Sequence, residues 1–131
     1  MSNKYRSPFF TELYGDDYAS ELEQYLRDLH PDLNEAVQRL AYDGLWGRVG
    51  LSQRDKSLIT VASLVALYRP EQLQLHIRGF LNSGGTVDEL SNTFIHLSGY
   101  CGFPPILTAF RILKETIHNL GASKGQDEAS S

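Results

Sequence analysis

Residues 73–86 read LQLHIRGFLNSGGT, and this stretch sets the expected fold class of the chain. Its apolar residues Leu73, Ile77 and Phe80 recur at intervals of three or four, which is the spacing of one buried face of an α-helix. The run ends in Asn-Ser-Gly-Gly, a combination typical of a helix stop. His76 lies beside the apolar face, so we predict a helix whose histidine is at the margin of a core.

The same helical signal repeats along the chain, and no run of residues alternates between apolar and polar as a half-buried strand would. Ser52 with Asp55, and Thr86 with Glu89, have the spacing of N-terminal helix caps. Residues 57–67, SLITVASLVAL, are apolar almost all round, which predicts a central helix. The predicted helices cover about residues 16–29, 31–46, 52–67, 70–82, 86–101 and 103–121.

The two ends of the chain differ from its middle. Residues 1–15 contain four aromatic side chains, so we expect this arm to be packed against some other surface. Asp16 or Asp17 is expected to cap the first helix after it. Residues 121–131, GASKGQDEASS, are small and polar, which predicts a disordered tail. The expected fold is therefore all-α, a single-domain helical bundle of about six helices over residues 16–120.

Composition narrows the class of protein. The 131 residues suit one domain, and a net charge of −4 without a basic stripe argues against a nucleic-acid partner. One cysteine, Cys101, cannot form a disulfide within the chain. The longest apolar stretch, residues 58–67, is about half of what a membrane span needs. The first residues lack an apolar core of signal-peptide length, so we expect a cytoplasmic protein without a membrane partner.

Two histidines are candidates for chemistry. His76 lies beside one apolar stripe, while His96 and Tyr100, four residues apart, share a helix face beside the next. Together with Cys101 they can surround one cavity. The alternative is that each histidine is a hydrogen-bonded structural residue and Cys101 an inert core residue. Neither histidine has a second His or Cys at ligand spacing, so no metal site is expected.

Three segments carry a family resemblance. They are LWGRVGLSQRDKSLIT at 45–60, ALYRPEQLQLHIRGFLNSGGTVDEL at 66–90 and IHLSGYCGFP at 95–104. In order and spacing they resemble the carboxymuconolactone decarboxylase family over about residues 40–115. The resemblance implies an all-helical, alkyl hydroperoxidase-like fold. It also implies a homo-oligomer built from trimers, often a hexamer, with active sites near the subunit contacts.

The family has two branches, and the redox branch fits poorly. That branch has a CxxC motif one turn before the histidine that matches His76, and the two positions are Arg69 and Gln72 here. The chain is therefore similar to a divergent member without the redox motif, and peroxidase activity is not expected. The other branch removes carbon dioxide from 4-carboxymuconolactone during degradation of aromatic compounds. The residues that stand where that branch expects them include Trp46, Arg48, His76, Arg78, His96 and Tyr100.

The resemblance implies a lyase that decarboxylates a carboxylated lactone or a related small acid. His76 and His96 are the expected catalytic residues, and the expected substrate-binding residues are Arg48, Arg78, Trp46 and Tyr100. The substrate supplies its own electron sink, so no metal or organic cofactor is expected. The familial glutamate two residues before Trp46 is Gly44 here. This departure keeps open acid–base chemistry on another metabolite (isomerisation, dehydration or cyclisation) and a non-catalytic, ligand-binding oligomer.

Overall fold

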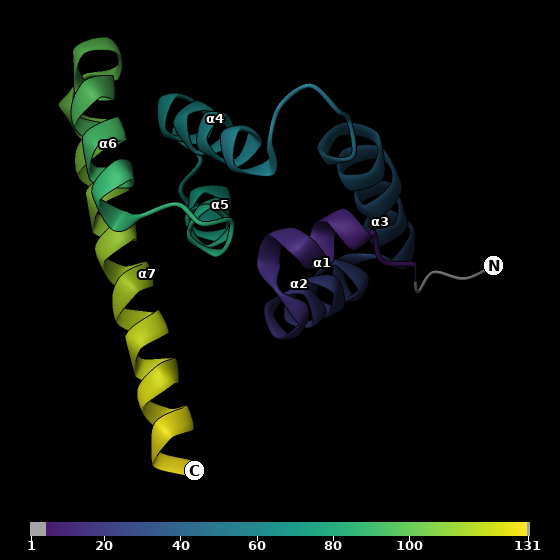
Figure 1. Ribbon diagram of the computed structural model, residues 1–131. Coiled ribbons are helices and arrows are strands. Elements are labelled where there is room, and N and C mark those ends of the chain that lie inside the picture. The colour runs from purple at the N-terminus through teal and green to yellow at the C-terminus, as the bar shows by residue number, and fades with distance from the viewer. Residues whose placement is uncertain (1–4, 131) are drawn as a thin grey trace. The chain divides into compact units, whose positions relative to one another are not determined.

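The computed structural model describes the backbone of residues 5–130 and the side chains of residues 5–121. Every element in this range is helical, with no strand, which confirms the all-α prediction (Figure 1). None of the helices in the described range is both long enough and apolar enough to cross a lipid bilayer. The elements are α1 (Pro8–Tyr14), α2 (Asp16–Leu29), α3 (Pro31–Ala36), the π-helix η1 (Val37–Trp46), α4 (Gln53–Ala66), α5 (Pro70–Asn82), α6 (Val87–Cys101) and α7 (Phe103–Ser130).

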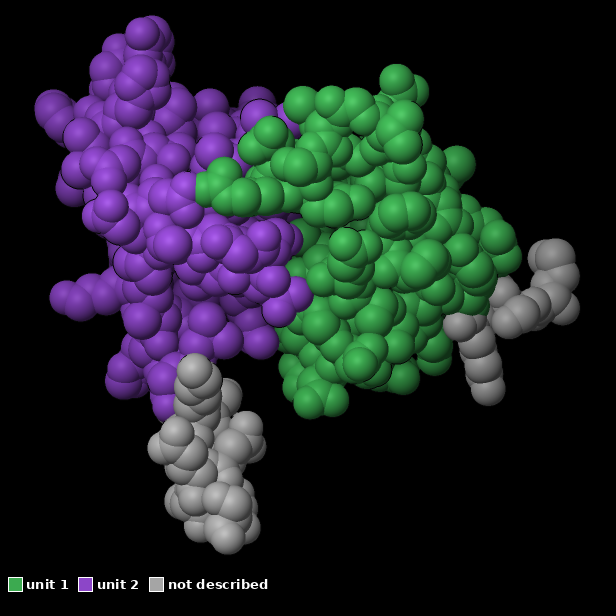
Figure 2. Space-filling view, in the orientation of Figure 1, with its two compact units in different colours: residues 1–56 green, residues 57–131 purple. Residues whose placement is uncertain are grey.

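The chain divides into two compact units, residues 1–56 and residues 57–131 (Figure 2). Unit 1 contains α1, α2, α3, η1 and the first turn of α4. Unit 2 contains the rest of α4 with α5, α6 and α7. The single domain expected over residues 16–120 stays a prediction.

The N-terminal arm contains a helix that the sequence pattern did not predict. Ser7 caps α1 by accepting a hydrogen bond from the backbone N–H of Phe9 at 3.2 Å, and Pro8 fits the first turn. Phe10 and Tyr14 are buried, which confirms that the arm packs against the protein. Gly15, at φ 81°, ends α1 and begins α2, so the expected cap at Asp16 or Asp17 is wrong. Both aspartates lie instead in the first turn of α2, where their negative charges interact favourably with the positive end of the helix dipole.

The predicted helix over 31–46 is present but changes type part-way, from α3 to the π-helix η1. A π-helix has hydrogen bonds from i to i+5, so a step of four residues comes closer to a whole turn than in an α-helix. Asn34, Gln38, Tyr42 and Trp46 therefore follow one face. The first three of these residues are buried. The Gln38 side chain forms two hydrogen bonds: its Oε1 accepts from the backbone N–H of Ser7 at 2.9 Å, and its Nε2 donates to the Asn34 side chain at 3.3 Å.

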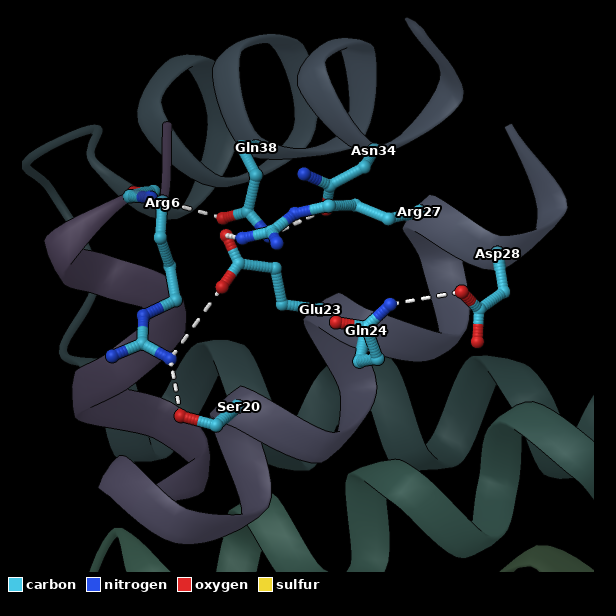
Figure 3. A network of polar contacts seen from close by, with 9 residues as sticks. Arg6, Ser20, Glu23, Gln24, Arg27, Asp28, Asn34 and Gln38 are labelled. Atoms are coloured by element: carbon cyan, nitrogen blue, oxygen red, sulfur yellow. Dashed lines mark hydrogen bonds and ion pairs between the residues drawn. The ribbon is translucent and has the colours of Figure 1, made fainter. Parts of the chain in front are cut away.

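A polar network joins α2 to the segment before α1 (Figure 3). The Glu23 side chain is only 9% exposed, and its carboxylate lies 2.7 Å from the Arg27 guanidinium and 3.7 Å from that of Arg6. Arg6 also donates to Ser20 at 2.8 Å. A buried carboxylate needs opposite charge close by, so the two arginines are what make this position of Glu23 tolerable.

The core of unit 2 lies where the helical periodicity predicted it. Leu73, Ile77 and Phe80 of α5 are buried, as are Leu90 and Phe94 of α6. Helices α5 and α6 each pack against α7, which runs beside α6 (Figure 1). The core residues that α4 and α7 add are Val61, Val65, Ile106, Ala109, Ile112 and Leu113.

Helix α4 corrects the expectation of a centrally buried helix. Val61 and Val65 are buried, but Ile59 is 53% exposed, so the helix presents one face to the core of unit 2 and another to solvent. Because the sequence of α4 is apolar on all sides, it did not distinguish the buried face from the exposed face. The pattern of hydrophobic residues therefore predicted the helix but not its burial.

The predicted helix boundaries are largely confirmed. Thr86 and Glu89 form a reciprocal capping box, and the Ser52 hydroxyl accepts from the Asp55 backbone N–H at 3.0 Å. Helix α5 ends at Asn82, as predicted. Gly85 is required there because a Cβ would lie 2.2 Å from the Phe80 ring.

The last helix runs further than predicted. The backbone of α7 is helical to Ser130, whereas the sequence predicted an end at Gly121. Side chains from residue 122 onward, and residue 131 entirely, lie outside the described residues, so the predicted disordered tail is untested.

Candidate functional site

His76 lies at the edge of the unit 2 core, as predicted. It is half-buried on α5 between the buried Leu73 and Phe80, and its Nδ1 atom is inaccessible to solvent. Burial disfavours the charged imidazolium and lowers the pKa of His76 to about 4. The ring is therefore neutral at neutral pH, so it can donate or accept a hydrogen bond but does not carry charge.

Arg78 is the second polar side chain of this helix. It is half-buried, two residues after His76. Residues two apart do not share a helix face, so the imidazole and the guanidinium leave α5 in different directions.

His96 and Tyr100 form a pair on α6. Their rings are 5.4 Å apart at 40°, which confirms that they share a helix face. His96 is exposed, and Tyr100 is 79% exposed, so both face solvent more openly than a position beside the buried stripe suggested. Cys101 is half-buried against the core, as expected of a small apolar residue.

The predicted cavity around these side chains stays a prediction. Two hollows are described in unit 2. One, of about 10 Å³, lies between the end of α4, the start of α5 and the start of α7. The other is an open surface depression along α7. Neither is lined by His76, Arg78, His96 or Tyr100.

Trp46 and Arg48 belong to unit 1, at the end of η1. The Trp46 ring stacks on Tyr42 at 6.0 Å and 13° between the ring planes. Tyr42 is fixed in turn by a 2.7 Å hydrogen bond between its hydroxyl and that of Tyr14. Burial raises the pKa of Tyr42 to about 12, and that of Tyr14 is also raised, so both phenols stay protonated. The stack gives the indole a defined position beside the exposed Arg48.

The chain turns sharply after Trp46, and two residues that sequence reasoning missed hold this corner. Lys56 Nζ donates to the carbonyl oxygens of Trp46, at 2.8 Å, and of Arg48. Gln53 Nε2 donates to the Trp46 carbonyl at 3.0 Å. No sequence signal marks these contacts because their acceptors are backbone atoms. Gly47 is also required, since a Cβ would lie 2.4 Å from the Asp43 carbonyl oxygen and 2.9 Å from the Phe9 ring.

The candidate side chains differ in the chemistry that is open to them. Guanidinium groups bind carboxylates in two-point fashion, and a neutral imidazole in apolar surroundings can donate to an oxygen that gains charge. Across the side chains that the structure describes, no three His, Cys, Asp or Glu residues group closely enough to hold a metal ion.

Comparison with known proteins identifies a matching family and two relatives. A family model described as "Carboxymuconolactone decarboxylase family" matches residues 31–115. The chain is 34% identical over 111 residues to a 4-carboxymuconolactone decarboxylase of Acinetobacter baylyi, covering 85% of this chain and 83% of that protein. It is 29% identical over 118 residues to the nitrosuccinic acid decarboxylase npaB of Metarhizium robertsii, covering 88% and 80% respectively.

Proposed function

The chain belongs to the carboxymuconolactone decarboxylase family, and from that premise we propose that it decarboxylates a small carboxylated acid, with 4-carboxymuconolactone as the first candidate substrate. The observation that carries the proposal is His76, a neutral imidazole at the edge of an apolar core, on the helix that the family resemblance singles out. The relatives are named as decarboxylases, and one is named for this lactone.

The substrate class follows from what the two named compounds share. Each is an acid with two carboxyl groups and an electron-withdrawing group, an unsaturated lactone in one and a nitro group in the other. In both, the bond to the departing carboxylate breaks and its electron pair moves toward a lactone or nitro oxygen. Carbon dioxide leaves, and a proton is then added to carbon. The step needs no external electron acceptor, because the substrate holds the pair.

We propose His76 as the donor to the oxygen that collects this charge. An imidazole with a pKa of about 4 is neutral at pH 7. Its N–H can therefore stabilise a developing oxyanion by donating a hydrogen bond, without first becoming positively charged. His96, whose side chain is exposed to solvent, is the proposed source of the proton for carbon.

The remaining candidates bind the substrate in this proposal. Arg48 and Arg78 bind carboxylates, since a guanidinium matches the two oxygens of that group. Trp46 supplies an apolar wall, and Tyr100 supports the His96 ring beside it. Apolar walls favour the reaction because the departing carboxylate loses hydration while carbon dioxide needs none.

Turnover of fresh 4-carboxymuconolactone, followed by ultraviolet absorbance and carbon dioxide release, tests the proposal. The wild-type protein should accelerate the reaction over buffer. His76→Gln should lower turnover at least about 100-fold with the fold intact by circular dichroism, as expected for a positioned proton donor. His118→Gln, which changes an exposed histidine on α7, is the matched control. Full turnover by His76→Gln would assign His76 to structure and refute its role.

A second candidate function rests on Gly44. This residue, exposed on η1, stands where the family resemblance expects a glutamate, so a proton shuttle through that group is absent. Acid–base chemistry on another small acid or lactone, such as isomerisation, dehydration or cyclisation, remains compatible with His76 and His96. A thermal-stability screen of cyclic acids and lactones, followed by a turnover assay on each hit, separates this function from ligand binding without catalysis.

We also propose that the protein assembles as a homo-oligomer, a trimer or a hexamer. Support comes from exposed large apolar side chains near the α6–α7 connection of unit 2, namely Ile95, Tyr100, Phe103 and Leu107. Apolar side chains gathered at a surface are typical of protein interfaces. Light scattering coupled to gel filtration measures the assembly directly, and a monomer at micromolar concentration would refute this proposal.

A further inference from the structure

We propose that Lys56 and Gln53 are positioning residues for the carboxylate-binding Arg48. They hold the backbone of residues 46–48, here called the Trp46–Arg48 corner, in one conformation. The inference rests on the proposed function, because it assigns these residues to the binding of the same substrate. All of its contacts lie within unit 1.

The corner is fixed on one side by packing. Trp46 stacks on Tyr42, and the Gly47 backbone N–H donates to the Tyr42 carbonyl at 2.9 Å, so the chain leaves η1 in a defined direction. The close approach of Gly47 to the Phe9 ring leaves no room for a side chain there. Up to Gly47, neighbouring side chains therefore restrict the corner.

Beyond Gly47 this packing ends. Arg48 and Gly50 are exposed, and Val49 is 96% exposed. Gly50 has φ +122°, a conformation that residues with side chains rarely adopt, and nothing lies within 4 Å of where its Cβ would be. Side-chain burial thus contributes little to the conformation of residues 48–50. Hydrogen bonds to the backbone must restrict it instead.

Lys56 and Gln53 supply those hydrogen bonds from the first turn of α4. The Lys56 ammonium spans the corner by donating to the Trp46 carbonyl at 2.8 Å and to that of Arg48, and Gln53 adds a second donor to the Trp46 carbonyl at 3.0 Å. An ammonium has three donors, so it can bind two carbonyl groups at once. These contacts tie the segment that carries Arg48 to a helix.

The charge of Lys56 matters as well as its geometry. The last carbonyl groups of a helix carry partial negative charge, and a carboxylate approaching Arg48 would be repelled by the neighbouring carbonyl oxygens. An ammonium bonded to those oxygens opposes this repulsion. Lys56 therefore favours binding of an anion at Arg48 in two ways, by ordering its backbone and by offsetting nearby negative charge.

Trp46 is the only tryptophan in the chain, so its fluorescence reports on the corner directly. Lys56→Met removes the donors but keeps an unbranched side chain, and Lys56→Arg keeps donors and charge. Lys114→Met, at an exposed lysine of α7, is the matched control. We expect Lys56→Met to increase the rapid loss of Trp46 fluorescence anisotropy, whereas Lys56→Arg and Lys114→Met leave it as in the wild type. Gln53→Met should cause a smaller increase, because it removes one bond.

The kinetic arm separates positioning from general stability. Lys56→Met should raise KM about tenfold with kcat changed less than about threefold, because loss of preorganisation weakens binding more than chemistry. Lys56→Arg should restore KM to within about threefold of the wild type. Succinate, a simple dicarboxylate, should compete with the substrate. Its inhibition constant should rise in Lys56→Met by the same factor as KM.

The possible outcomes distinguish this inference from the proposed function. Unchanged Trp46 anisotropy in Lys56→Met would refute the positioning role, whatever the activity. A KM increase no larger than that of Lys114→Met would refute the link to Arg48. Absence of turnover in the wild type would refute the proposed function. In that case calorimetry still measures succinate binding to Lys56→Met and to the wild type. Equal succinate affinities of the two proteins would overturn the inference that the Trp46–Arg48 corner sets carboxylate affinity.

Discussion

Replacing His76 by glutamine should make the fold less sensitive to acid. In the folded chain burial lowers the pKa of His76 to about 4, against 6.5 for an unhindered histidine. Between these two values the unfolded chain binds a proton that the folded chain does not. The stability that comes from keeping His76 neutral is therefore fully present above pH 6.5, and this contribution is lost as the pH falls toward 4.

The size of this effect follows from the shift. One pKa unit corresponds to about 1.4 kcal/mol, so the wild type should lose about 3 kcal/mol of unfolding free energy over the whole window. Between pH 7 and pH 5 alone, the loss from His76 comes to about 2 kcal/mol. This is a large fraction of the stability of an ordinary domain, which is about 5–15 kcal/mol.

Urea unfolding followed by far-ultraviolet circular dichroism at pH 7 and pH 5 measures the difference. The loss between the two pH values should be about 2 kcal/mol smaller in His76→Gln than in the wild type. His118→Gln changes an exposed histidine and should lose as much as the wild type. Equal losses in all three proteins would refute the argument, because they would mean that burial does not keep His76 neutral.

Three further predictions test the packing of unit 1, each by the free energy of unfolding in urea. Gly47→Ala should destabilise by about 1–3 kcal/mol because its methyl group overlaps a ring and a carbonyl oxygen; Gly44→Ala, whose Cβ meets nothing closer than 3.5 Å, should be neutral or stabilising, and equal effects would contradict the reasoning. Tyr14→Phe should cost about 1–3 kcal/mol by leaving the Tyr42 hydroxyl buried without its partner, and adding Tyr42→Phe should recover part of this loss; a purely additive double variant would argue against the hydrogen bond. Glu23→Gln should cost about 2–4 kcal/mol because two arginines lose their shared carboxylate, and a cost no greater than that of the exposed Glu21→Gln would show that the network does not contribute.

Helix spacing was sufficient to predict most of unit 2. The recurrence of Leu73, Ile77 and Phe80 predicted a buried face, and the side chains of Thr86 and Glu89 predicted a helix start, because both signals depend on residues a few positions apart. The short helix α1 escaped prediction since its seven residues are too few to show periodicity, although its aromatic side chains indicated that the arm packs.

The surroundings of the candidate residues were predicted only in part. The two histidines were singled out because each lies beside an apolar stripe at helical spacing, and the pairing of His96 with Tyr100 followed from their spacing of four. The exposure of that pair did not follow, because spacing defines which residues share a face and not what covers it. Lys56 and Gln53 carried no signal at all, since they bind carbonyl oxygens that every residue possesses.

The sequence by itself determined the helical class of this protein, the family to which it belongs and the residue types available for chemistry, because these depend on local periodicity and on motifs of fixed order. Only the tertiary structure decided that His76 is neutral, that Glu23 is buried between two arginines, and that a lysine holds the corner beside Arg48. The physical reason is the same in each case. Dielectric environment and hydrogen bonding depend on atoms that the fold brings close, and the residues that supply those atoms are distant or carry no distinctive pattern in the chain.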